Sequence, residues 1–114
     1  MYYIYMLRCE DNSIYTGITN DIKRRWEEHH SKDEKGAKYT KGHNVLKIEA
    51  LWITEDRKLA SKLEYHIKHL QKEKKEELIK TKDLKKYLSQ KIECEKYQYM
   101  GNKIWYKEMW FMEI

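Results

Sequence analysis

Four side chains near the start of the chain have types and spacings that could bind and act on an anion. Tyr5 closes the stretch Tyr-Ile-Tyr (3–5), and Tyr15 opens Tyr-Thr-Gly (15–17). Arg25 follows Tyr15 by ten residues, and His29 follows Arg25 by four. An arginine that faces the interior must be paired or must face an anion, because an unpaired charge is costly to bury. If the two phenols converge beside it, the group forms a site.

The helix that carries Arg25 and His29 decides whether they can face the sheet. At about 100° per residue, Ile22 and Trp26 define its core-facing stripe. His29 then falls about 20° from Ile22, and Arg25 falls about 60° from it, on the same side. The remaining polar positions point outward. They are Lys23, Arg24, Glu27 and Glu28.

Each of these residues also has an ordinary structural interpretation. Tyrosine favours strands, so Tyr5 and Tyr15 could simply pack against their neighbours. Arg25 could belong to a structural ion pair, and His29 could be a satisfied core histidine. The four residues together favour a site more than any one of them does.

The tyrosines lie on two strands that the pattern predicts over residues 2–9 and 14–18, joined as a hairpin. Side chains alternate along a strand, so the number of loop residues decides whether the two phenols share a face. A loop over 11–13 pairs Glu10 with Ile14 and Cys9 with Tyr15, which puts Tyr5 and Tyr15 on one face. We therefore predict a loop with an odd number of residues, or a bulge that restores the same parity. On that face we also expect Arg25 and His29 from the first helix and Glu64 from the later one.

The rest of the chain predicts a small α/β domain, with a three-stranded mixed or antiparallel sheet flanked by helices and an added C-terminal β-hairpin. The further elements are a helix over 21–30 with Asn20 as N-cap, a strand over 45–53, a helix over 55–71 with Thr54 as cap, a mostly helical charged segment over 72–92 in two pieces, and a hairpin around Gly101-Asn102.

Composition narrows the class of protein. The chain has 114 residues, which fits one domain, and its net charge of +5 suits a polyanionic partner. Cys9 and Cys94 are predicted to be free thiols in a reducing compartment. The start of the chain lacks the pattern of a signal peptide, and no apolar run approaches membrane-spanning length. A cytoplasmic protein without membrane contact is expected.

The ordered set of motifs resembles the GIY-YIG nuclease family. Tyr3-Ile4-Tyr5 stands for its first motif and Tyr15-Thr16-Gly17 for its second, and Arg25 and His29 match in spacing. Glu64, in "LASKLEYHIKHL", stands where the family holds its metal-binding glutamate. "TGITNDIKRRWEEH" and "GAKYT" are similar to stretches of the small bacterial single-domain members.

The resemblance covers roughly residues 2–80 and departs from the family in two places. Tyr3 replaces the glycine of the first motif, as in the small relatives. Ile18 stands where some repair members have a lysine, so a helper cation is absent there. The resemblance implies a nuclease domain over 1–80 and a C-terminal extension over 81–114, a helix plus hairpin, packed on it.

The resemblance implies a metal-dependent endonuclease that hydrolyses DNA. Tyr5 and Tyr15 would hold and deprotonate the attacking water, and Arg25 would bind the scissile phosphate. His29 would orient a tyrosine or shuttle a proton. Glu64 would hold one Mg²⁺ or Mn²⁺, and no organic cofactor is expected. The alternative for Glu64 is a surface ion pair four residues along its helix.

Other residues are expected to contact nucleic acid. Gly17 would let the backbone approach the substrate closely. In the Lys-rich connection, Lys38, Tyr39 and Lys41 would track phosphates, unless this segment is simply a solvated loop.

Two rival functions differ in kind. His66 and His69, with His29-His30, make a zinc site conceivable, although the helical spacing of the first two is poor and no cysteine pair supports them. The second rival is a non-catalytic DNA- or RNA-binding domain with the same fold. The sequence does not indicate the oligomeric state.

Overall fold

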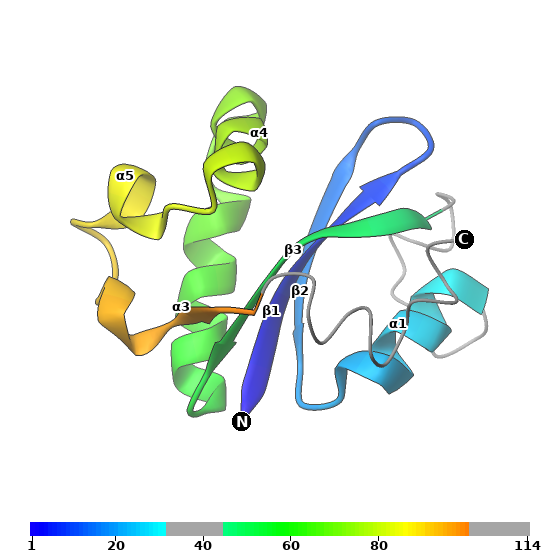
Figure 1. Ribbon diagram of the computed structural model, residues 1–114, viewed down its shortest axis with the longest axis horizontal. Coiled ribbons are helices and arrows are strands. Elements are labelled where there is room, and N and C mark those ends of the chain that lie inside the picture. The colour runs from blue at the N-terminus through cyan, green and yellow to red at the C-terminus, as the bar shows by residue number, and fades with distance from the viewer. Residues whose placement is uncertain (32–44, 101–114) are drawn as a thin grey trace.

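The computed structural model describes residues 1–31 and 45–100, and the side chains of residues 29–31 lie outside that description. Figure 1 shows the elements in space. In chain order they are β1 (Tyr2–Cys9), β2 (Ile14–Thr19), α1 (Ile22–Ser31), β3 (Val45–Thr54), α3 (Arg57–Lys68), α4 (Lys72–Thr81), α5 (Leu84–Leu88), a 3-10 helix (Cys94–Lys96) and β4 (Gln98–Tyr99).

The described strands form an antiparallel sheet in the order β2-β1-β3-β4. The predicted α/β class is confirmed, but the prediction of three strands is wrong. The fourth strand comes from the C-terminal extension, where Gln98 and Tyr99 pair with Ile53 and Trp52 of β3. The predicted turn at Gly101-Asn102 and the rest of the hairpin lie outside the described residues.

The two faces of the sheet are buried by different helices, which Figure 1 shows on opposite sides of it. One face, the α3 face, carries Ile4, Met6 and Trp52 and packs against α3, α4 and α5. The other, the α1 face, carries Tyr5 and Leu7 and packs against apolar residues of α1, including those predicted to form its stripe. Strand β1 is therefore buried on both sides, as its continuous apolar pattern predicts.

Helix α1 begins one residue later than predicted, and its cap is Asp21, not Asn20. The Asp21 carboxylate accepts a hydrogen bond from the backbone N–H of Arg24 at 3.1 Å. The hydroxyl of Thr19 in turn accepts the N–H of Asp21 at 3.0 Å. Adjacent polar residues can all serve as caps, and the local turn selects one of them.

Helix α3 likewise uses a different cap from the predicted one. Asp56 accepts from the backbone N–H of Leu59 at 2.9 Å. Thr54 is the last residue of β3, and its hydroxyl donates to the carbonyl of Lys96 at 2.8 Å. The Thr54 side chain thus ties the C-terminal extension to the sheet instead of starting α3.

The charged segment after residue 71 forms two helices, α4 and α5, as predicted. Leu78, Leu84 and Leu88 are buried together with the core of the α3 face, and so is Tyr97. The described part of the extension is therefore continuous with the core of the preceding residues.

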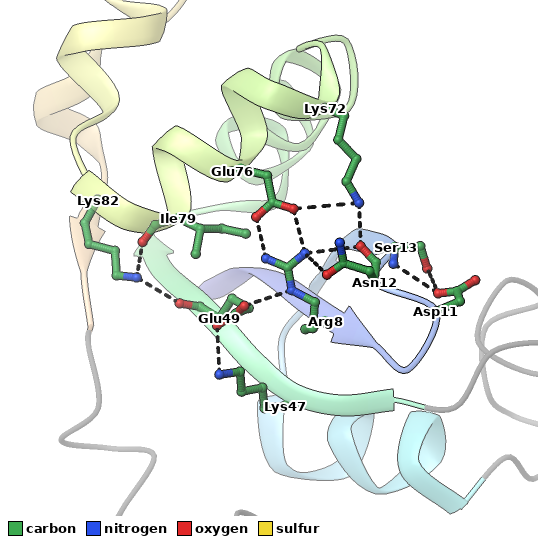
Figure 2. Close-up of polar contacts among 10 residues, drawn as sticks. All are labelled: Arg8, Asp11, Asn12, Ser13, Lys47, Glu49, Lys72, Glu76, Ile79 and Lys82. Carbon is green, nitrogen blue, oxygen red and sulfur yellow. Dashed lines mark hydrogen bonds and ion pairs between the residues drawn. The ribbon is translucent and has the colours of Figure 1, made fainter.

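A polar network on Arg8 holds α4 against the hairpin (Figure 2). The Arg8 guanidinium bonds Glu49 of β3 at 2.9 Å and Glu76 of α4 at 2.5 Å. It also donates to the Asn12 side chain at 3.2 Å, and Lys72 donates to the Asn12 carbonyl. Three separate segments are linked through one guanidinium, whose planar donor fork suits such sharing.

Two expectations from composition can be compared with the structure. Cys9, buried in β1, and Cys94, in the 3-10 helix, both remain thiols, as predicted. Within residues 1–31 and 45–100, none of the helices combines the length and apolar character needed to cross a bilayer.

Candidate active site

Tyr5 and Tyr15 project from the same face of the sheet, as the parity argument predicts. Tyr5 pairs with Gly17, and Leu7 pairs with Tyr15. Paired residues share a face, and so do Tyr5 and Leu7, two apart on β1. The ring centroids of the two tyrosines are 6.3 Å apart, with ring planes at 39°.

The predicted pairing of β1 with β2 is wrong by two residues. Tyr15 pairs with Leu7 and not with Cys9, and Ile14 pairs with Arg8 and not with Glu10. Residues 9–13 stay outside the ladder between β1 and β2, and the Cys9 N–H donates to the Ser13 carbonyl at 3.0 Å. The loop is longer than predicted but still odd, so the phenols keep a common face.

Gly17 lies directly beneath the Tyr5 ring. A Cβ at Gly17 would sit 2.4 Å from the Tyr5 hydroxyl oxygen, 2.6 Å from Tyr5 Cζ and 3.0 Å from Tyr15 Cε2. Glycine is needed here because the tyrosine across the strand pair fills the space of a side chain. The sequence predicts that a substrate approaches the backbone closely at Gly17. In the structure the group that approaches Gly17 is the Tyr5 side chain.

Arg25 faces the sheet, in agreement with its predicted helical direction. Its side chain is 23% exposed, whereas that of Arg24 is 59% exposed. Arg25 Nη1 bonds Glu28 Oε1 at 2.8 Å, and Arg24 Nε lies 3.9 Å from Glu28 Oε2. The prediction that Glu28 points outward is wrong, because this carboxylate turns toward the two arginines and is only 14% exposed.

Tyr5 is the buried centre of the group. Its side chain is 1% exposed, and burial raises its pKa above the ordinary value for a phenol. The negative charges of ionised Tyr15 and of Glu64 raise this pKa further, while a hydrogen bond with Arg25 lowers it. Tyr15, Arg25 and Glu64 therefore all lie within electrostatic reach of one phenol.

The pKa of Arg25 reflects the same contacts. Burial lowers the pKa of the guanidinium, but hydrogen bonds with Glu28 and Tyr5 outweigh burial and raise it above its ordinary value. Arg25 is thus a permanent cation that bridges a carboxylate and a buried phenol.

Glu64 approaches from the opposite side of the sheet, on α3. The expectation that it would come from the same face as the tyrosines is wrong, because α3 packs on the α3 face beside the edge strand β2. Its neighbour Lys68 lies 3.3 Å from the Glu64 carboxylate and 5.8 Å from the Tyr15 ring centroid. Glu64 therefore reaches the site around the edge of the sheet, and the i,i+4 ion pair proposed as its alternative is present.

Four predicted site residues cannot be placed. His29 belongs to α1 by its backbone, but its side chain lies outside the described residues. Lys38, Tyr39 and Lys41 also lie outside them. The residue that sequence reasoning missed is Glu28, and its i,i+3 spacing from Arg25 was the available signal.

The donor set at Glu64 limits the kind of metal that the site could hold. No cluster of three histidine, cysteine, aspartate or glutamate side chains suited to a metal occurs in the described parts of the chain. The single carboxylate of Glu64 does not suit a structural zinc site, which takes four protein ligands. One carboxylate does suit Mg²⁺, which keeps most of its water ligands.

Comparisons with known proteins identify the family of the chain. Residues 1–77 match the model of the GIY-YIG catalytic domain. A UPF0213 protein from Fusobacterium nucleatum is 54% identical over 82 residues, which are 72% of this chain and 80% of that protein. UPF0213 protein YhbQ from Escherichia coli is 42% identical over 78 residues, 68% of this chain and 76% of that protein.

A solved structure is also similar in sequence. The solution NMR structure of UPF0213 protein BH0048 from Bacillus halodurans is 41% identical, covers 72% of this chain and 86% of that chain, and has a TM-score of 0.44. The family match spans the segment that contains Tyr5, Tyr15, Arg25 and Glu64, and a catalytic domain of this family indicates a nuclease. The chain belongs to the GIY-YIG family, among relatives that are small bacterial single-domain proteins.

Proposed function

We propose that the protein is a divalent-metal-dependent endonuclease that hydrolyses DNA phosphodiester bonds. One observation carries the proposal: Arg25 hydrogen-bonds Tyr5, with Tyr15 and Glu64 close to the same phenol. Four elements of the fold, β1, β2, α1 and α3, contribute one group each. Such convergence of a cation, two phenols and a carboxylate suits attack on a phosphate better than it suits packing.

The two tyrosines have different roles in this proposal. The raised pKa of Tyr5 keeps its buried hydroxyl protonated at neutral pH, so Tyr5 acts as a hydrogen-bond donor at the site. Tyr15 lies at the edge strand, is partly exposed and has Lys68 near its ring. Tyr15 is therefore the tyrosine that positions the attacking water and relays its proton: the hydroxyl oxygen accepts the water proton as the hydroxyl's own proton passes to solvent.

Arg25 binds the scissile phosphate through an exchange of partners. Its guanidinium is bonded to Glu28, a carboxylate that presents oxygens much as a phosphate does. A phosphate that reaches Arg25 competes with Glu28 for the same donors. The fork geometry then fixes the phosphate between the two tyrosines, and His29 orients a tyrosine or shuttles a proton from the next turn of α1.

Glu64 is the residue that would hold one Mg²⁺ or Mn²⁺, which would supply a positive charge to stabilise the leaving oxygen. Its carboxylate is 23% exposed and paired with Lys68, so it is accessible to a hydrated ion that displaces the lysine. The single carboxylate fits an ion that retains most of its water ligands.

A DNA- or RNA-binding domain without catalysis is the second candidate. It is favoured by the two ion pairs, Arg25 with Glu28 and Glu64 with Lys68, which satisfy the charges of the site within the protein. The two functions differ in their products: an endonuclease cleaves DNA and needs a metal and an intact Glu64 to do so, whereas a binding domain leaves the DNA uncut.

The test is a cleavage assay on supercoiled, branched and single-stranded DNA with Mg²⁺, Mn²⁺ or EDTA. We expect Arg25→Gln to lower cleavage at least ~100-fold, the usual effect of removing one donor to a developing charge. Lys23→Gln is the matched control, because Lys23 is exposed on the same helix and loses the same charge. Equal losses from the two variants would refute the role of Arg25.

Glu64→Gln tests the metal. The variant keeps the shape of the side chain and deletes its charge, so it should lose metal-dependent cleavage and keep DNA affinity within several-fold. Glu73→Gln, at an exposed position of α4, is the control and should cleave normally. DNA binding without cleavage by the wild-type protein under every metal condition would establish the binding-only alternative instead.

A further inference from the structure

A cationic pocket adjoins the candidate active site, and two of its arginines, Arg24 and Arg57, are not used by the proposed chemistry. It has a volume of about 280 Å³ and is lined by Arg24 and Arg25 from α1 and by Arg57 from α3. Glu28 is the acidic residue among its lining side chains. Three guanidinium groups from two elements and one carboxylate give this pocket a net positive charge.

Arg57 lies on the side of α3 that bears Glu64. The two are seven residues apart, and at about 100° per residue they point within roughly 20° of each other. Lys68 continues this row at four residues beyond Glu64 and lies 5.8 Å from the Tyr15 ring centroid. The row therefore follows the edge of β2, with Arg57 at one end and the tyrosines toward the other.

Arg25 connects the pocket with the site. It lines the pocket and also hydrogen-bonds Tyr5, so one guanidinium borders both. Arg57 lies about 10 Å along α3 from Glu64, at 1.5 Å rise per residue. Because Arg25 and Arg57 line one pocket, neighbouring phosphates of one extended strand could occupy the site and the pocket at the same time.

We propose that Arg24 and Arg57 form a second phosphate-binding subsite, which holds the backbone phosphate of a nucleotide next to the scissile bond. This inference rests on the proposed function, because it assigns a path to the same substrate. The strand lies along the edge of β2 between α1 and α3. Arg57 is a positioning residue that contacts substrate away from the reacting atoms.

The helix supplies a matched control for Arg57. Lys58 is the next residue, is also exposed, and lies about 100° around α3, away from the row. Arg57→Gln and Lys58→Gln remove one charge each from the first turn of the same helix. Any general effect of net charge or of the helix terminus is therefore common to both variants.

The experiment measures affinity for a fluorescein-labelled single-stranded DNA in EDTA, over a series of salt concentrations. We expect Arg57→Gln to weaken binding roughly 3- to 10-fold and to reduce the salt slope by about one, while Lys58→Gln leaves the slope unchanged. Arg57→Lys should recover most of the slope. Equal slopes for Arg57→Gln and Lys58→Gln would overturn the subsite.

A cleavage measurement separates this inference from the proposed function. With metal, Arg57→Gln should raise KM and change kcat less than ~3-fold, whereas Arg25→Gln should lower kcat at least ~100-fold. If the wild-type protein cleaves DNA and Arg57→Gln has the same KM as Lys58→Gln, the subsite fails and the proposed function stands. If the wild-type protein neither binds nor cleaves DNA, both fail.

Discussion

Replacing Gly17 by alanine is the sharpest test of how the site is packed. The new Cβ would lie 2.4 Å from the Tyr5 hydroxyl oxygen, about 1 Å closer than the 3.4 Å at which ordinary contact begins. The Tyr5 ring is 1% exposed and packed in the core of the α1 face, so it cannot simply swing away. Overpacking of this kind costs about 1–3 kcal/mol of unfolding free energy.

Thermal unfolding followed by circular dichroism measures this cost. In a domain of this size, 1 kcal/mol corresponds to roughly 4 °C, so Gly17→Ala should lower Tm by about 4–12 °C. Alanine at an unobstructed strand position would instead stabilise, because glycine loses more backbone entropy on folding. A variant with an unchanged or higher Tm would refute the close packing of Tyr5 over Gly17.

A double-mutant cycle identifies the clash. Tyr5→Leu removes the hydroxyl and Cζ atoms that the new Cβ would meet, so Gly17→Ala should cost at least ~1 kcal/mol less in that background. Effects that add within ~0.5 kcal/mol would show that the two residues are not in conflict. In the cleavage assay, Gly17→Ala should also reduce activity, since the Tyr5 hydroxyl must move relative to Arg25.

Three further predictions concern stability. The pKa of Tyr5 is raised in the folded state, so Tyr5 loses its proton on unfolding above pH ~10. The free energy of unfolding should therefore fall as pH rises above that value, and Tyr5 should contribute at most ~1.4 kcal/mol per pH unit to the fall. In urea titrations, Tyr5→Phe should make the fall shallower. Arg8 lowers the pKa of Glu76, so the stabilisation it gives is present above the ordinary carboxyl range and is lost as pH falls; Glu76→Gln should flatten the acid limb of a Tm–pH profile, and an unaltered limb would contradict this. Asp56→Ala should cost ~1 kcal/mol of unfolding free energy through loss of the cap on Leu59, whereas a value near zero would show that α3 does not depend on it.

Features of the site that depend on local periodicity could be predicted from the sequence. The direction of Arg25 follows from its angle to Ile22 and Trp26, and a helix of ten residues leaves little freedom in that angle. The common face of Tyr5 and Tyr15 follows from parity, which does not change when the register shifts by two residues. Both predictions are correct although the predicted start of α1 and the predicted length of the hairpin loop are wrong.

Features that depend on long-range packing could not be predicted. Nothing near Glu64 in the sequence shows that α3 packs on the opposite face and reaches the site around β2. The pairing of Gln98 and Tyr99 with β3 joins residues far apart in the chain, and a two-residue strand has no periodicity of its own. The choice of Asp56 over Thr54 as cap depends on the contact of Thr54 with Lys96, which is also distant.

The ion-pair and catalytic interpretations of the site are compatible with each other. In the structure Arg25 is bonded to Glu28, and Glu64 is paired with Lys68, so both charges of the proposed chemistry have protein partners. A phosphate would compete with Glu28 for Arg25, and a divalent ion would compete with Lys68 for Glu64. Because exposed ion pairs contribute only about 0–1 kcal/mol, release of the half-exposed Lys68 from Glu64 costs little. Arg25 would exchange one anionic hydrogen-bond acceptor for another, so its guanidinium would stay paired. The same two pairs that make the residues look structural would therefore leave them available to a polyanion and a metal.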